Sequence, residues 1–439
     1  MWLRIKRILS NKKVMLRVAF TVLILLVVRV LSHITVPLFN ANAIRNFIEQ
    51  SGSFVAILNN FSGRALERFS IMALGISPYI TASIVVQLLQ MVVPKFKEIA
   101  QEGDKGKQRL NKYTRYGAVI LAFVQAFILI IGTNQGPGSI LIVELEGYDI
   151  TNYRYLFYIY MALVMAAGTA LAIWLGDLIT KKGIGNGTSI LIVAGIVTSL
   201  PTMITMLWGK YISATGTDGW DVVWFMLIIL FYFAILLGVV YMQIAVRKIP
   251  IQYANRQGKA DSNIPMKLNS AGVIPVIFAQ TILSIPLTIS GALGQTSSFA
   301  QWIGAIFNYQ QPMGFILYVL LIIIFSFFYS FLTVDPEKIA DNLSKSNAYI
   351  PGIRPGEETK NYVARLLFKI TVIGTAYLVV LAILPLLTSI VLGFNAAESQ
   401  AITLGGTSLL IIVGVAIETT QQLETDASQA EYGGIFARR

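Results

Sequence analysis

The sequence has no cysteine and only one histidine, His33. Without cysteine the chain can form no disulfide, thiolate metal site or cysteine nucleophile. A single histidine excludes a multi-histidine metal site and leaves little scope for a Ser-His-Asp triad. A Walker A loop is also missing, because Gly106-Lys107-Gln108 lacks the serine or threonine that would hold magnesium. We therefore expect that the protein is not an enzyme and binds no cofactor. If it performs energy-requiring work, another molecule would have to supply the energy.

Charged residues are scarce, at 13% of the 439 residues against 55% hydrophobic ones. A soluble globular domain carries about 25% charged residues, so this balance indicates a protein surrounded by lipid. Apolar runs of about twenty residues, long enough to cross a bilayer as helix, recur down the chain. We therefore predict an all-α polytopic membrane protein with ten transmembrane helices. The runs lie near 18–38, 70–93, 114–132, 155–176, 187–207, 221–243, 271–293, 312–333, 369–392 and 401–417.

Lysine and arginine predict the orientation of these spans. With ten spans, 28 of the 34 basic residues fall at the two termini and in the loops after spans two, four, six and eight. Because basic loops stay cytoplasmic during insertion, both termini are expected in the cytoplasm. Five spans on each side of a central loop give two halves of opposite topology, which commonly enclose a path at their interface. We thus expect two inverted five-helix halves around a central pore.

The expected divisions follow from this topology. They are an amphipathic cytoplasmic N-terminus at 1–17, an N-terminal half at 18–207, an external hinge loop at 208–220, a C-terminal half at 221–417 with cytoplasmic loops at about 244–268 and 334–368, and a cytoplasmic tail at 418–439.

Ionisable residues are almost absent from the interiors of the spans. Ion-coupled transporters usually need carboxylates or histidines at mid-membrane depth, so the pattern favours a conduit for polypeptide. A ten-helix secondary transporter with inverted repeats stays open as the alternative, because sugar and amino-acid carriers can work with few buried charges. A membrane-embedded enzyme is a third hypothesis, but the sequence contains no plausible catalytic cluster to support it.

Spans two and seven are rich in hydroxyl and amide groups and contain Pro78, Pro275 and Pro286. Each proline removes a backbone hydrogen bond and favours a kink. Polar side chains in a span face protein or water more readily than lipid. Two interpretations stay open: packing of helices through small polar residues, or two helices that line one aqueous path and can part.

Six motifs occur in order over nearly the whole chain. They are Ala73-Leu74-Gly75-Ile76-Ser77-Pro78-Tyr79-Ile80-Thr81-Ala82-Ser83-Ile84, Gly183-Ile184-Gly185-Asn186-Gly187, Ala271-Gly272-Val273-Ile274-Pro275, Ala340-Asp341-Asn342-Leu343, Pro351-Gly352-Ile353-Arg354-Pro355-Gly356-Glu357 and Gly405-Gly406-Thr407-Ser408-Leu409-Leu410-Ile411. Together they resemble the SecY family, the channel subunits of the bacterial Sec preprotein translocase. The resemblance implies a protein-conducting channel in the plasma (inner) membrane, which exports unfolded secretory polypeptides and releases hydrophobic segments sideways into lipid.

In the SecY family an hourglass-shaped pore is closed at its waist by a ring of aliphatic side chains, which excludes ions by dewetting and yields around a passing chain. By motif position the ring here would be Ile76, Ile80, Ile192, Ile277 and Ile411. Spans two and seven would form a lateral gate, held by interhelical hydrogen bonds of about 0.6 kcal/mol each. The gate residues would be Ile84, Gln87, Gln125, Asn269, Thr281 and Ile285.

The apolar stretch from Phe54 to Leu66 is too short and too polar to span a bilayer, so it predicts a re-entrant or surface half-helix. Its place between spans one and two resembles the plug of the family, at about 52–66. An ordinary outer loop is the alternative. The plug residues would be Phe54, Ile57, Leu58, Asn60, Phe61, Ser62 and Gly63.

The loops after spans six and eight are long and basic. The positive-inside rule explains most of these charges, but not the paired prolines and glycines of the second loop, which predict a rigid tip. The resemblance implies that these loops bind the SecA motor and the ribosome, the latter through RNA phosphates. The binding residues would be Arg247, Lys248, Arg256, Lys259, Arg354, Pro355 and Gly356. The other implied partners are the small membrane subunits SecE and SecG, signal peptides, secretory preproteins and membrane lipid.

Overall fold

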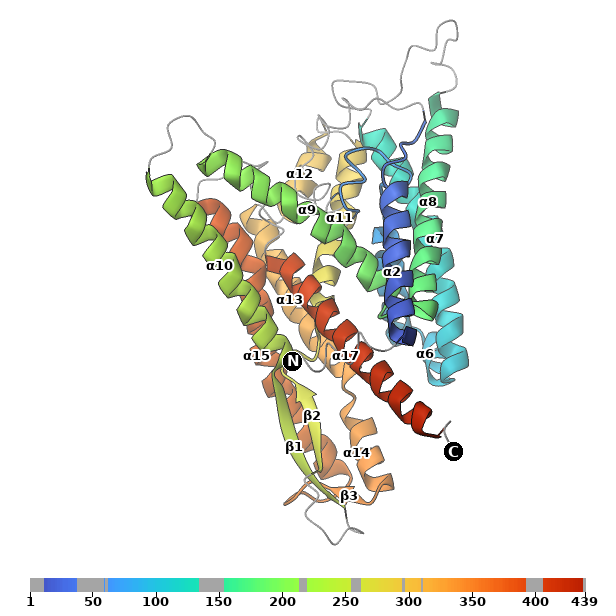
Figure 1. Ribbon diagram of the computed structural model, residues 1–439, viewed down its shortest axis with the longest axis vertical. Helices are drawn as coiled ribbons and strands as arrows, with labels where there is room; N and C mark the ends of the chain where they lie inside the picture. Colours follow the sequence, from blue (N-terminus) through green and yellow to red (C-terminus); the bar gives the residue numbers. More distant parts are fainter. Residues whose placement is uncertain are drawn as a thin grey trace, which may run out of the picture. The chain divides into compact units, whose positions relative to one another are not determined.

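A computed structural model describes residues 12–37, 59, 62–133, 154–212, 219–253, 262–293, 297–308, 311–391 and 406–436 (Figure 1). The helices are α2 (Lys12–Leu31), α5 (Ser77–Val92), α6 (Pro94–Gln101), α7 (Asp104–Thr133), α8 (Arg154–Lys182), α9 (Gly187–Tyr211), α10 (Gly219–Ile244), α11 (Ile274–Leu293), α12 (Ser298–Phe307), α13 (Pro312–Thr333), α14 (Pro336–Lys345), α15 (Glu357–Val391) and α17 (Gly406–Phe436). The strands are β1 (Val246–Tyr253), β2 (Ser262–Lys267) and β3 (Ala348–Tyr349).

Each of the ten predicted spans overlaps one helix of the structure. By length and composition, seven of the described helices can cross a membrane, or eight if α5 and α6 form one bent span. The polytopic helical fold is therefore confirmed, and the count of ten stays a prediction. Several helices continue beyond the apolar runs. For example, α15 begins at Glu357, inside the expected loop at 334–368, and α17 continues through most of the expected tail.

The chain divides into two compact units. Unit 1 contains Met1–Met206, Leu283–Gln311 and Val415–Arg439, and unit 2 contains Leu207–Ile282 and Pro312–Gly414. The first boundary lies one residue from the expected end of the N-terminal half. However, unit 1 also takes two pieces of the expected C-terminal half, and α11 and α17 each pass from one unit to the other. The inverted halves themselves stay a prediction.

Contacts within unit 1 explain why it includes its late segments. The Arg17 guanidinium donates to an Asp426 carboxylate oxygen at 2.7 Å, which ties the end of α17 to α2. The Ser290 hydroxyl donates to the Ala300 carbonyl at 2.8 Å and so fixes α12 against the second part of α11. These polar bonds join segments that are far apart in sequence, and no apolar run could predict them.

Small residues let the helices of unit 1 approach closely, as α7 and α8 do along their length (Figure 1). Ala122, Ala126 and Ala162 are fully buried in the same cluster. A Cβ at Gly168 of α8 would lie 1.9 Å from the carbonyl oxygen of Ile71, so only glycine fits there. Packing of small residues is a main source of helix association inside a membrane.

The two expected loops of unit 2 are not simple loops, because they also contain three short strands that the sequence did not predict. The strands form an antiparallel sheet in the order β2-β1-β3, with Ile249 opposite Ile264. Ile249 and Ile251 alternate with exposed residues and pack, together with Leu343 and Leu367, in a small core. We call residues 246–253, 262–267 and 336–356 the loop module. It is a folded structure whose apolar interior is completed by the first turns of α15.

Candidate functional site

The connection between α2 and α5 folds back onto the end of α2. We call Ser62–Ile71 the return segment. The amide of Val36 donates to the Phe69 carbonyl, and the amide of Ile71 donates to the Ile34 carbonyl, both at 2.9 Å. Phe69 is fully buried and Leu66 is 1% exposed. The later part of the return segment is therefore anchored to the first span by backbone pairing and by apolar packing.

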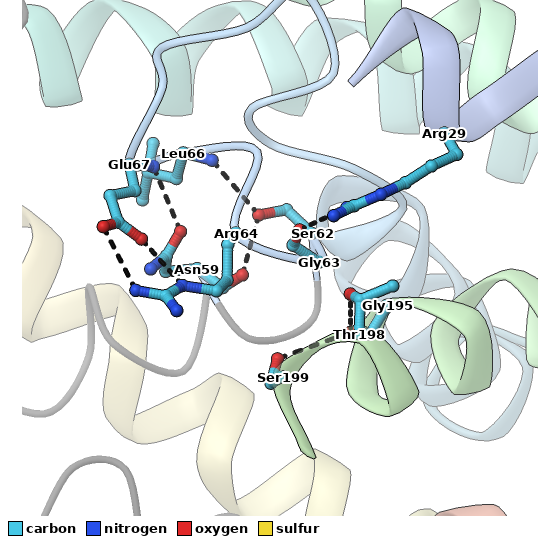
Figure 2. Close-up of polar contacts among 10 residues, drawn as sticks. All are labelled: Arg29, Asn59, Ser62, Gly63, Arg64, Leu66, Glu67, Gly195, Thr198 and Ser199. Atoms are coloured by element: carbon cyan, nitrogen blue, oxygen red, sulfur yellow. Dashed lines mark hydrogen bonds and ion pairs between the residues drawn. The ribbon is translucent and has the colours of Figure 1, made fainter. Parts of the chain in front are cut away.

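Gly63 lies where the return segment comes close to α2 and α9 (Figure 2). The Arg29 guanidinium of α2 donates to the Gly63 carbonyl at 3.0 Å. A Cβ on Gly63 would lie 2.9 Å from Oγ1 of Thr198 and 3.2 Å from Cα of Gly195, both on α9. Gly63 also has φ +66°, in the left-handed region that favours glycine. No other residue fits this position without strain.

Side-chain bonds within the return segment complete its conformation (Figure 2). The Arg64 guanidinium makes a two-pronged ion pair with Glu67, at 2.8 and 3.1 Å. The Asn59 side-chain oxygen accepts from the Glu67 amide at 3.1 Å, and the Ser62 hydroxyl donates to the Asn59 carbonyl at 3.0 Å. Arg64 and Phe69 have φ of +63° and +46°. Such backbone costs of the order of 1–3 kcal/mol each and persists only where the surroundings impose it.

A cavity of about 290 Å³ lies beside the return segment and has a net positive lining. This cluster was not predicted from the sequence. The signal was present, because basic residues on the expected outer side are exceptions to the positive-inside rule. Three of these basic residues line the cavity, together with one carboxylate and two hydroxyl groups. The lining residues are Arg29, Arg64, Glu67, Arg68, Thr198 and Thr202.

Of the predicted plug residues, the structure describes Ser62 and Gly63, both in the return segment. Ser62 accepts from the Leu66 amide at 3.4 Å, and Gly63 makes the contacts given above. The remaining predicted plug residues, Phe54, Ile57, Leu58, Asn60 and Phe61, lie outside the described residues.

The predicted ring residues are divided between the units. Ile76 and Ile80 belong to one apolar cluster of unit 1, where Ile76 is 6% exposed and precedes the first residue of α5. Ile192 follows Leu191, a member of that cluster. Ile277 and Ile411 belong to unit 2, on α11 and α17. A ring of all five would join side chains of both units and stays a prediction.

Two of the predicted gate residues, Gln87 and Asn269, have hydrogen-bond partners close to them in sequence. The Gln87 amide donates to the Ser83 hydroxyl at 3.3 Å, and Oε1 of Gln87 and of Gln125 is buried without a hydrogen-bond partner in the described part of the chain. Asn269 is 5% exposed and donates to the Gly272 carbonyl at 3.1 Å. The structure therefore gives Asn269 a role in the turn before α11, and a polar gate cluster stays a prediction.

The remaining gate residues differ in exposure. Ile84 of α5 is 3% exposed, Thr281 is half-buried, and Ile285 is 44% exposed. Ile285 follows the point between Ile282 and Leu283 where α11 passes from unit 2 to unit 1.

The tip of the loop module is rigidly built. The Glu358 carboxylate accepts from the Arg354 amide at 3.4 Å, and the Thr359 hydroxyl donates to the Arg354 carbonyl at 2.9 Å. Gly352 and Gly356 have φ of +82° and +100°, which explains both glycines of the motif. The Arg354 side chain remains exposed beside Pro355.

Of the other predicted binding residues, Arg247 and Lys248 are exposed on β1, and Arg256 and Lys259 lie outside the described residues. No group of three His, Asp or Glu side chains in the described ranges could hold a metal ion.

Comparisons with known proteins agree with this architecture. The family model described as SecY matches residues 70–420. The protein translocase subunit SecY of Halalkalibacterium halodurans is 44% identical over 430 residues, covering 96% of each chain. Two solved structures show the same fold. One is a SecY protein whose plug domain stabilises the closed state of its translocation channel (TM-score 0.64, 18% identity, 94% of this chain and 92% of that one). The other is canine Sec61 in a ribosome-channel complex (TM-score 0.60, 17% identity, 94% and 93%).

Proposed function

Because the chain belongs to the SecY family, we propose that it is a protein-conducting channel, which moves unfolded secretory polypeptides across the membrane and releases hydrophobic segments into lipid. The proposal requires a path that is closed at rest and opens for a chain. The elements that would close it are the return segment and the isoleucine ring.

The observation that supports this function best is the way the return segment is held. It is buried at Leu66 and Phe69, yet two of its non-glycine residues have positive φ, and its Gly63 end is fixed by one hydrogen bond and one close contact. A segment in strained backbone is released at lower cost than a relaxed one. We infer that it is the C-terminal part of a plug that leaves when a polypeptide enters.

The ring would act at the waist of the path. Isoleucine side chains offer no hydrogen bonds to water or ions, so a narrow ring of them stays dry when empty. They can move around a peptide of any sequence, because their contacts with it are not directional. The lateral gate between spans two and seven would open beside this ring and expose a signal peptide to lipid.

The loop module would face the cytoplasm and bind the energy source. Its rigid tip presents Arg354 on a backbone that Glu358 and Thr359 hold in place, as a specific docking site requires. We propose that the SecA motor and the ribosome bind here, and that SecE and SecG are the small membrane partners. Both termini would then be cytoplasmic.

A crosslink tests the channel directly, because the chain has no native cysteine. We would introduce Ile277→Cys, and place a second cysteine in a secretory protein that is stalled partway through export in membrane vesicles. A disulfide that depends on the signal sequence and on ATP is the expected result. Ile316→Cys is the matched control, because Ile316 is 62% exposed on α13.

Either result is informative. A crosslink at Ile277 but not at Ile316 would establish passage of the polypeptide through the ring. If no ring position reacts although the substrate is demonstrably stalled, the pore assignment is wrong, and the ten-helix transporter becomes the better hypothesis.

A further inference from the structure

A second cavity, of about 780 Å³, lies within unit 2 between β1, the tip of the loop module and the first turns of α15. Its walls are of two kinds. One part is basic and is formed by Arg247, Arg365 and Lys369. The other part is apolar and is formed by Leu268, Ile353, Leu366, Ile370 and Ile373. The cavity is therefore amphipathic, with charge and apolar surface side by side.

The three cations have no partner in the described part of the chain. Arg247, Arg365 and Lys369 form no ion pair or hydrogen bond there. The one carboxylate of the cavity belongs to Glu358, which already accepts a hydrogen bond from the Arg354 amide. Three unpaired cations gathered around one cavity repel each other, and an anion would relieve that repulsion.

The cavity also lies at the level where two spans leave the apolar layer. Arg247 is the first charged residue after Asp221, which opens α10, and Lys369 is the last charged residue before Glu398. The cations therefore mark the membrane surface, and Ile373 lies about one turn deeper than Lys369 along α15. Ile373 is 52% exposed, so its side chain is open to a ligand from the bilayer.

We propose that this cavity binds an anionic phospholipid of the surrounding leaflet. Its phosphate would contact Arg247, Arg365 and Lys369, and its first acyl carbons would lie on Leu366, Ile370 and Ile373. Basic pockets between membrane helices bind anionic headgroups in this way, at about 1 kcal/mol per basic residue. The bound lipid would fix α15 to β1 at the base of the loop module.

The test is lipid binding by the full chain, purified together with its membrane partners and measured by native mass spectrometry. Phosphatidylglycerol is the probe and phosphatidylcholine the neutral comparison. The variant R365Q/K369Q removes two of the cations and should weaken phosphatidylglycerol binding about thirty-fold, the equivalent of 1 kcal/mol for each residue. K338Q/K345Q is the matched control, because it removes two charges from α14 of the same module, outside the cavity.

Unchanged phosphatidylglycerol binding by R365Q/K369Q would overturn the proposal, as would equal losses in both variants. Equal binding of phosphatidylcholine would show that the anionic group is not recognised. If inorganic phosphate competes as well as the lipid does, the cavity is a simple anion site. If phosphatidylglycerol binds only after the partner subunits are removed, the cavity belongs to a protein contact. The thermal stability of each variant separates loss of binding from loss of folding.

Discussion

The return segment and the loop module both connect helices, yet the structure holds them in different ways. The loop module shares an apolar core with the first turns of α15, and it has a sheet in regular register and a tip with satisfied backbone bonds. The return segment has no interior of its own. Its Leu66 and Phe69 are buried in an apolar cluster formed mainly by other parts of unit 1. It has positive φ at Gly63, Arg64 and Phe69, and it depends on contacts with α2 and α9.

The difference matches the two tasks that we propose for them. A docking surface for a motor must keep its shape under load, so it profits from a sheet and an apolar core that hold it against the first turns of α15. A plug must be stable at rest and still leave, so it profits from strained backbone that its packing holds in place. Variants that remove a buried side chain from the loop module, or that add strain to the return segment, can test this comparison.

The largest effect is expected for Ile249→Ala in the core of the loop module. Ile249 is 3% exposed, and replacing a buried isoleucine with alanine costs about 2–5 kcal/mol. We expect faster proteolysis of the module in membrane vesicles with the spans unaffected. Val246→Ala on the same strand is the control, because Val246 is 43% exposed. Equal proteolysis of both variants would show that burial of Ile249 does not hold the module together.

The second effect is expected at the tip. Arg354→Glu reverses the exposed charge while leaving the backbone bonds of Arg354 in place. We expect motor-driven export to fall about ten- to a hundred-fold, the equivalent of about 1.4–2.8 kcal/mol. Lys345→Glu makes the same reversal on α14 and should export normally. Normal export by Arg354→Glu in ATP-driven vesicle assays would remove the proposed role of the tip.

The third effect concerns the strain of the return segment. Gly63→Ala adds a Cβ at φ +66° and 2.9 Å from Oγ1 of Thr198. Gly103→Ala is a matched control, because Gly103 has φ +74° and nothing within 4 Å of its would-be Cβ. Left-handed backbone costs alanine about 1–2 kcal/mol at both sites. Any further loss at Gly63 therefore reports its contact with α9.

We expect Gly63→Ala, but not Gly103→Ala, to leak ions and to export preproteins with defective signals. Adding Thr198→Ala removes the nearest atom and should partly restore closure, which makes the pair non-additive. If the two glycine variants behave alike, the close approach to α9 has no part in closure.

The helices were predictable because lipid selects long apolar runs, and each predicted run overlaps a helix. Their ends were not predictable in this way. Hydropathy marks only the part of a helix that lies in lipid, and α15 continues from residue 369 back to Glu357 as an amphipathic helix with one face buried against the loop module. The sheet was missed because β1 and β2 contain Pro250 and Pro265, and because β3 lies almost a hundred residues from β1.

The candidate sites were predictable only in part. The isoleucine ring and the tip came from the family resemblance, and composition alone could not select five isoleucines from so many. The Arg29 contact with Gly63 joins residues 34 apart, and no local pattern encodes it. The gate residue Asn269 was expected to reach another helix, and the structure instead gives it a bond to the turn that precedes its own helix.

The smallest effect is expected at this turn, which joins the loop module to the gate helix. Asn269→Leu removes the hydrogen bond to the Gly272 carbonyl, worth about 1 kcal/mol, and leaves that carbonyl unsatisfied. The turn thereby loses one of the bonds that fix its conformation, and α11 gains freedom relative to β2. We expect marginal signal sequences to be exported about fivefold faster.

Ser270→Ala removes the neighbouring bond to the Lys267 carbonyl, on the side of the turn away from α11, and should leave export unchanged. Equal export of marginal signals by the wild type and Asn269→Leu would mean that the loop module and the gate helix move independently.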